Sequence, residues 1–92
     1  MKNTVAVEVS TVPVRAVVQN AKRTSLAIAN TSSTVIVYMG SDNQVSTVDA
    51  FPLYPGMIMT FNAGMGDRPD IERWLVADAA ADIRITEDYG GV

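Results

Sequence analysis

The stretch Arg23-Thr-Ser-Leu-Ala-Ile-Ala-Asn-Thr-Ser-Ser-Thr-Val-Ile-Val-Tyr-Met-Gly40 decides the fold class. Two runs rich in β-forming residues, Ser25 to Ala29 and Val35 to Met39, flank the polar segment Asn30 to Thr34. In the first run leucine and isoleucine share one face, whereas the second run is apolar on both faces. Asn, Ser and Thr stabilise turns through bonds to their own backbone, and a segment of this length joins neighbouring antiparallel strands. The stretch therefore predicts the central hairpin of an all-β domain.

Further segments carry strand patterns and predict six to eight short strands in total. In residues 4–9 the valines share one side, and in residues 57–61 Met57, Met59 and Phe61 are expected to be buried together. Residues 71–76 contain Trp74, which is expected to be the largest anchor of its strand. The other predicted strands span residues 14–18, 51–53 and 83–87. This pattern predicts a small antiparallel β-sandwich or a jelly-roll-like barrel.

Turn-forming residues separate these segments. Pro13 lacks an amide donor and predicts an edge or a break. Tyr54-Pro-Gly-Met57 fits a type II turn, because proline sets φ at its second position and glycine accepts a positive φ at its third. Long loops are expected over residues 40–49 and 62–70, a turn over 77–82 and a tail over 88–92. Residues 1–20 are expected to form either a strand of the domain or an arm that pairs with a neighbour, and residues 21–92 the sandwich core.

Composition narrows the classes of partner. A chain of 92 residues with 48% hydrophobic and 18% charged residues is a single globular domain. The low charge leaves a neutral surface of Ser, Thr, Asn and Ala, which is common where a protein packs beside copies of itself. A net charge of −3 and scattered basic residues argue against nucleic acid as a partner. The start resembles no signal peptide and no run reaches membrane-spanning length, so we expect no membrane partner and synthesis in a cytoplasm.

The catalytic repertoire is narrow, because the sequence contains neither His nor Cys. A Ser-His-Asp site, a Cys nucleophile and a thiolate or His metal site are thereby excluded. A carboxylate pair remains, but each acidic cluster fits a solvated turn, and a small β domain rarely supplies the cleft that catalysis needs. These clusters are Asp67 and Asp70, Asp78 and Asp82, and Glu87 and Asp88. We therefore expect no enzyme, no catalytic residues and no cofactor.

Calcium is the remaining metal candidate. Residues 66–70, together with Asp42 and Asn43, offer oxygen atoms without the dense acidic spacing of a dedicated calcium loop. Arg68 is expected to pair with Asp67 or Asp70 instead. We therefore predict no metal site.

Four minor features have structural interpretations. Gly64-Met-Gly66 lacks the Lys-Ser/Thr of a phosphate loop, and the sequon Asn30-Thr-Ser32 fits a turn better than a glycosylation site. Met39, Met57, Met59 and Met65 are expected to fill the core or an interface. The aromatic residues would form a sugar-binding platform only if they converged, and core or rim packing is favoured. They are Tyr38, Tyr54, Trp74 and Tyr89.

The order of elements resembles a family of small β-sandwich virion proteins of tailed bacteriophages. The matching segments span roughly residues 20–88, which is most of the chain, and contain no catalytic residue. They are Arg23-Thr-Ser-Leu-Ala-Ile-Ala-Asn30, Val35-Ile-Val-Tyr-Met-Gly40, Phe51-Pro-Leu-Tyr-Pro-Gly56 and Ile83-Arg-Ile-Thr-Glu87. The first twenty residues lie outside the match, which leaves the mode of attachment open.

The resemblance implies a structural protein of the virion. It implies a capsid decoration or cement protein that bridges and stabilises capsid subunits, with the major capsid protein or other virion proteins and copies of itself as partners. Its location would be the capsid surface, after assembly in the bacterial host cytoplasm. The alternative is a host-recognition or carbohydrate-binding module of a phage fibre or tail, and a third interpretation is a host-cell β domain of another role.

Overall fold

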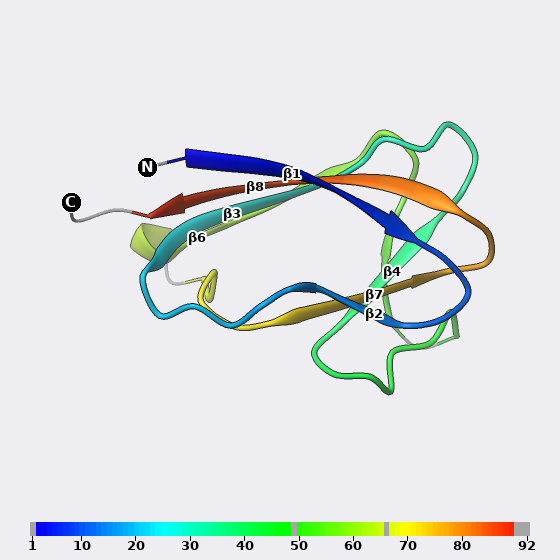
Figure 1. Cartoon of the computed structure of the whole chain (residues 1–92), viewed down its shortest axis with the longest axis horizontal. Coiled ribbons are helices and arrows are strands. Elements are labelled where there is room, and N and C mark those ends of the chain that lie inside the picture. Colours follow the sequence, from blue (N-terminus) through cyan, green and yellow to red (C-terminus); the bar gives the residue numbers. More distant parts are fainter. Residues whose placement is uncertain (1, 49, 66, 90–92) are drawn as a thin grey trace.

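Two antiparallel β-sheets pack face to face, which confirms the predicted all-β sandwich (Figure 1). The computed structural model describes residues 2–48, 50–65 and 67–89. Sheet A has the order β1-β8-β3-β6 and sheet B the order β2-β7-β4-β5. In both sheets, strands from the two halves of the sequence alternate, and this strand order is that of an eight-stranded jelly roll. The strands are β1 (Lys2–Val9), β2 (Val14–Val17), β3 (Arg23–Asn30), β4 (Val37–Gly40), β5 (Phe51–Leu53), β6 (Ile58–Asn62), β7 (Arg73–Ala77) and β8 (Ala81–Tyr89).

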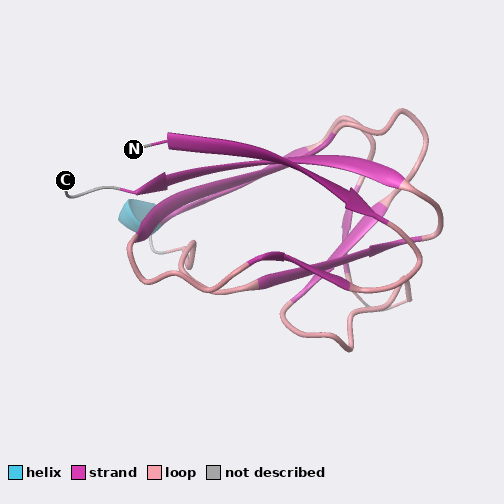
Figure 2. Cartoon of the chain, in the orientation of Figure 1, coloured by secondary structure: helices cyan, strands magenta, loops and turns pink. Residues whose placement is uncertain are grey.

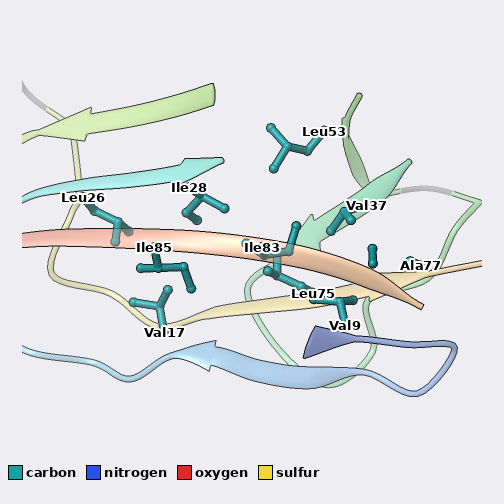
Figure 3. Packing of buried hydrophobic residues seen from close by; sticks show 11 residues of the cluster. Val9, Val17, Leu26, Ile28, Val37, Leu53, Leu75, Ala77, Ile83 and Ile85 are labelled. Atoms are coloured by element: carbon teal, nitrogen blue, oxygen red, sulfur yellow. The ribbon is translucent and has the colours of Figure 1, made fainter. Parts of the chain in front are cut away.

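The core fills the space between the two sheets. Leu26 and Ile28 of β3 point inward, as the alternation predicts, and meet Ile83 and Ile85 of β8 and Leu75 of β7 (Figure 3). Their burial follows from the two-residue period of a strand, which directs every second side chain to the same face. The remaining members of the buried cluster are Val9, Val17, Val37, Leu53, Ala77 and Ala81. Strands β1 and β2 therefore contribute side chains to the same core as the rest of the chain.

The predicted central hairpin is wrong. Strand β3 pairs with β6 and β8 in sheet A, whereas β4 pairs with β5 and β7 in sheet B. Residues 31–36 cross from one sheet to the other, because Asn30 is turned into the interior and holds the chain there. Its Nδ2 donates to the carbonyls of Val35 and Leu53, each at 2.8 Å, and its Oδ1 accepts the Ser32 N–H at 3.0 Å. We call Asn30, Ser32, Val35 and Leu53 the Asn30 corner.

A second buried polar side chain lies at the other end of β3. Arg23 is 3% exposed, and its guanidinium donates to the carbonyl of Pro69 at 2.9 Å and to that of Val18 at 2.6 Å. It also pairs with Glu87 of β8 at 3.2 Å. The register of β3 against β8 shifts between Arg23 and Ser25, which turns Arg23 inward. We call Arg23, Val18, Pro69 and Glu87 the Arg23 cluster.

The turns agree with their residue types. Met57 donates its N–H to the Tyr54 carbonyl at 2.9 Å and Gly56 has φ +79°, which confirms the type II turn. Pro13 lies in the break between β1 and β2, and β5, which contains Pro52, forms an edge of sheet B as predicted. The expected loop over residues 62–70 contains the short 3₁₀ turn η1 (Ala63–Met65), drawn as a helix in Figure 2. This turn is the one helical segment among the described residues. The described residues contain no helix that is long and apolar enough to cross a membrane.

Two expectations about the last third of the chain need correction. Leu75, not Trp74, is the buried anchor of β7, because Trp74 points to the outer side of sheet B and is half-buried. Strand β8 continues through Asp88 and Tyr89, which were expected in a tail. They extend the strand because Asp88 has register partners on both β1 and β3, and Tyr89 has one on β3. Asp49, Gly66 and residues 90–92 of the expected loops and tail lie outside the described residues.

Candidate contact surface

A row of small, neutral side chains crosses the outer face of sheet A, with charged residues of β1 and β8 on either side of it. The register aligns Thr4 of β1, Thr86 of β8, Ala27 of β3 and Thr60 of β6 in one row across all four strands. The hydroxyl oxygens of Thr4 and Thr86 lie 3.1 Å apart within this row. Because small side chains stand low above the backbone, another chain can approach this sheet closely. The neutral Ser, Thr, Asn and Ala surface expected from composition is thus gathered on this face.

A depression of about 440 Å³ lies on this face, above the start of β3. Its floor is low because the outer positions of β3 carry Ser25 and Ala27 between the larger residues of β6 and β8. Its lining offers hydroxyl, amide and carboxylate groups and no cation. The complete lining is Ser25, Leu26, Ala27, Thr60, Phe61, Asn62, Asp67, Thr86 and Asp88. These groups suit hydrogen bonding to a polypeptide.

Part of the outer face of sheet B, around Gly40 and Val76, is covered instead. The loop that follows β4 folds back so that a Cβ placed on Gly40 would lie 2.8 Å from the side chain of Val45. Gly40 therefore permits the close approach, and Val45 and Val76 become buried although both lie outside the central core. The contrast between the two outer faces leaves sheet A as the more open surface for a partner.

The acidic clusters do not form a catalytic pair. Asp70 accepts two hydrogen bonds from Arg68, at 3.0 and 3.2 Å, which confirms one of the two expected partners of Arg68. These bonds lower the pKa of Asp70 and raise that of Arg68. The neighbouring Asp67 accepts the N–H of Asn62 at 3.0 Å, and Asp82 pairs with Arg84 at 2.7 Å. Each of these carboxylates has a structural partner.

The remaining acidic residues are also dispersed. Asp78 lies exposed in the loop between β7 and β8, while Glu87 points inward to Arg23 and Asp88 points outward. The Tyr89 hydroxyl donates to Glu87, and this bond is the main reason that the pKa of Tyr89 is raised. In the segment considered as a calcium candidate, Asp42 accepts the N–H of Gln44 at 2.9 Å. Among the described residues, no three acidic, His or Cys side chains gather where they would hold a metal ion.

The aromatic residues divide between the two ends and faces of the molecule. Tyr38 and Trp74 occupy neighbouring positions on the outer side of sheet B, where the register pairs Tyr38 with Val76 and Trp74 with Gly40. Trp74 donates its indole N–H to Glu72 at 2.7 Å. Tyr54 is 53% exposed in the turn after β5, and Tyr89 lies at the far end of sheet A. Thus two of the four share a face, and the expected platform of four does not form.

The methionines and the sequon have the structural roles that were favoured. Met39, Met57 and Met59 pack against the buried cluster. Asn30 is 1% exposed with its amide in use, so in the folded chain it is not accessible to a glycosylating enzyme. The side chain of Met65 and the whole of Gly66 lie outside what the structure describes.

Sequence reasoning missed both buried polar side chains. Asn30 carries a usable signal, because it continues the inward positions of Leu26 and Ile28 at the same two-residue spacing. Arg23 carries no such signal, since its inward direction depends on the register shift after it. At the same end of the sandwich, the guanidinium of Arg73 lies 4.1 Å from the centre of the Phe61 ring, and burial lowers the pKa of Arg73.

Comparison with known proteins identifies no family. No protein-family model matches the chain, and no curated protein matches it. A solved chain from work on Bacillus endospore appendages, described as a novel family of disulfide-linked pili, is similar over 98% of this chain and 88% of that one. The two are 14% identical, with a TM-score of 0.44. This likeness does not identify a function. The small β-sandwich implied by the phage resemblance is confirmed, whereas no comparison supports its virion role.

Proposed function

We propose that this chain is a non-enzymatic structural protein of a tailed-phage virion that decorates or cements the capsid. The observation that carries the proposal is the uncovered outer face of sheet A, where small neutral side chains run across four strands. A neighbouring subunit that packs on this row alone removes no water from charged groups, because the charged residues of the face lie on either side of the row. The resemblance to β-sandwich virion proteins supplies the kind of neighbour, namely the major capsid protein and copies of this chain.

The location follows from the same proposal. A cement protein bridges subunits on the capsid surface, and many identical copies multiply contacts that are individually weak. The chain would be assembled onto the particle in the bacterial host cytoplasm, and neither a cofactor nor a metal ion would take part.

The first test is the copy number of this chain in purified virions, measured against the major capsid protein. Hundreds of copies that scale with the capsid lattice are expected of a decoration protein. A handful of copies would move the chain to the tail, neck or fibre. Absence from the particles would overturn the virion role altogether.

A surface variant tests whether the outer face of sheet A makes the contact. Ala27→Arg places a long charged side chain in the middle of the row, and it should abolish binding to particles. Ala79→Arg is the matched control, because Ala79 is exposed in the loop between β7 and β8. Both variants should fold, since each side chain extends into solvent. Equal particle binding by the two would contradict this choice of face.

A second candidate function is a host-recognition or carbohydrate-binding module. It is favoured by the shared position of Tyr38 and Trp74 on the outer side of sheet B. Trp74 is the single tryptophan in the sequence, so the tryptophan emission of the protein reports on that surface alone. A glycan that shifts or quenches this emission would support the recognition role. Emission unchanged by a broad set of glycans would remove it.

A further inference from the structure

Among residues 2–48, 50–65 and 67–89, no strand pairs with the outer edge of β1 in sheet A. Strand β1 pairs with β8 at all eight positions from Lys2 to Val9, and the register is unbroken. Its other side faces outward at the end of the strand order. In such a strand every second residue directs its N–H and C=O groups away from the sheet, where they form a template for another strand.

The other edges are poorer templates. Strand β5 is three residues long and contains Pro52, which has no N–H to donate. Strand β2 is four residues long, and its register against β7 shifts after Arg15. Strand β6 extends over five residues. Strand β1 is therefore the longest edge in the described part of the chain, and neither proline nor bulge protects it.

The side chains of β1 indicate what can pair with it. Val5 lies on the inward row with Val7 and Val9, yet it is 40% exposed, so the apolar row continues to an open side of the sandwich. On the outer row, Glu8 stands opposite Asp82, and like charges in directly opposed positions are unfavourable. A partner for this edge should therefore bring an apolar residue to Val5 and a cation to Glu8.

A second copy of β1 meets both requirements. When two copies run antiparallel with Val5 opposite Val5, residue Lys2 of each copy lies opposite Glu8 of the other, so residues of opposite formal charge occupy opposed register positions at both ends of the pairing. The intervening residues then place Thr4 opposite Ala6. A shift by two residues in one direction sets Lys2 opposite Ser10 and Glu8 opposite Thr4. The opposite shift sets Lys2 opposite Ala6 and leaves Glu8 beyond the end of the partner strand, so neither shift brings opposite charges together. A parallel arrangement in register would set lysine beside lysine and glutamate beside glutamate.

We propose that β1 pairs antiparallel with β1 of a second copy of this chain, centred on Val5. Equivalent positions keep the same face in this register, so the inward rows of both copies stay inward and two four-stranded sheets become one continuous sheet. A single edge contact buries little area, so the dimer is weak and depends on concentration. The inference deepens the self-association in the proposed function, but it concerns the purified chain and needs no particle.

Sedimentation equilibrium of the full chain over a range of concentrations tests the pairing. The unaltered protein should dimerise, and Glu8→Lys should weaken the dimer at least about tenfold, because it sets two lysines against two lysines. The double variant Lys2→Glu/Glu8→Lys exchanges the charges and should restore the dimer. Asp78→Lys carries the same change of charge at an exposed loop position and should leave the dimer intact.

Each other outcome overturns the proposal. A protein that stays monomeric at all concentrations has no β1 pairing. A dimer that Glu8→Lys leaves unchanged uses another surface, and one that the double variant fails to restore has another register. Thermal unfolding of every variant checks that the fold is retained. A failure here would leave the virion copy number unaffected, so the two proposals fall separately.

Discussion

Strand β3 begins at a buried arginine and ends at a buried asparagine. Both side chains donate hydrogen bonds to backbone carbonyls, but they differ in charge and in the segments that they connect. Arg23 and Asn30 each donate hydrogen bonds to two backbone carbonyls that belong to other segments. At the Asn30 corner the side chain is neutral, and its partners include Ser32 and Val35 nearby in the sequence. In the Arg23 cluster a charge is buried, and its partners extend to Glu87 on β8.

The difference shows how each end is stabilised. The asparagine uses both donors of its amide and its single oxygen, so the Asn30 corner is fully bonded. No group in the described part of the chain accepts a hydrogen bond from the Nε of Arg23, and the cluster relies on an ion pair as well as on carbonyl contacts. A buried ion pair offsets its cost of desolvation only in part. We therefore expect the Asn30 corner to fix the path of the chain. We expect the Arg23 cluster to connect distant segments while contributing less to the free energy of unfolding.

Asn30→Asp should cause the largest loss of stability among these variants. The carboxylate loses both N–H donors and places a negative charge against two carbonyl oxygens. Each orphaned buried group costs roughly 1–3 kcal/mol, so the loss should exceed about 4 kcal/mol. Urea unfolding followed by Trp74 emission measures it, and the loss should shrink in acid as the new side chain becomes neutral.

Asn62→Asp is the matched control for that variant. Asn62 is exposed and uses its side-chain oxygen to accept the Gly64 N–H at 2.9 Å, which a carboxylate also does. Its stability should change by less than about 0.5 kcal/mol. Similar losses at positions 30 and 62 would mean that the buried amide does not hold the corner.

Arg23→Met should have the next largest effect. It leaves the half-buried Glu87 carboxylate and two carbonyls without the guanidinium, a change that costs roughly 3–5 kcal/mol for a buried pair. The double variant Arg23→Met/Glu87→Met should lose less than the sum of the single variants, because it removes both charges. Arg84→Met, which breaks a surface pair with Asp82, serves as the control. Additive losses at positions 23 and 87 would show that the ion pair contributes nothing.

Asp70→Asn should have the smallest effect, and it should depend on pH. Asp70 and Arg68 flank Pro69, whose carbonyl belongs to the Arg23 cluster, and the pKa of Asp70 is lowered by Arg68. A carboxyl group with a lowered folded pKa stabilises the fold above its unfolded pKa, and that contribution is lost as the pH falls through the folded value. Urea midpoints should therefore favour the unaltered protein slightly near neutral pH and coincide with the variant at about pH 2. A difference that persists in acid would contradict this pairing as its source.

The predictable part of the structure was the part governed by local rules. The two-residue alternation of Leu26 and Ile28 gave their inward direction correctly, and the Pro-Gly pair at positions 55 and 56 gave the turn type. The path after Asn30 was not predictable in the same way. A polar segment of that length joins strands of one sheet or of two, and the choice depends on a carbonyl at Leu53 that lies far along the sequence.

The sequence predicted the composition of the candidate contact surface but not its location in the fold. Composition indicated a neutral Ser, Thr and Ala surface, while its concentration on sheet A depends on registers between strands distant in sequence, such as Thr4 opposite Thr86. The cover over sheet B depends on the close approach of Val45 to Gly40, which no local pattern reveals. The role of the N-terminal segment as a pairing arm stays a prediction, now assigned to β1.

The central position of β8 governs when the fold can form. Strand β8 lies between β1 and β3, although it follows the other seven described strands in the sequence. Until residues 81–89 leave the ribosome, β1 has no neighbour in its sheet and the core lacks Ile83 and Ile85. At translation rates of about 5–20 residues per second, the apolar strands of this chain wait roughly 5–20 s without their partners. During this time the apolar strand residues of the nascent chain are exposed and can bind chaperones. We expect stop codons that remove β8 to yield insoluble products.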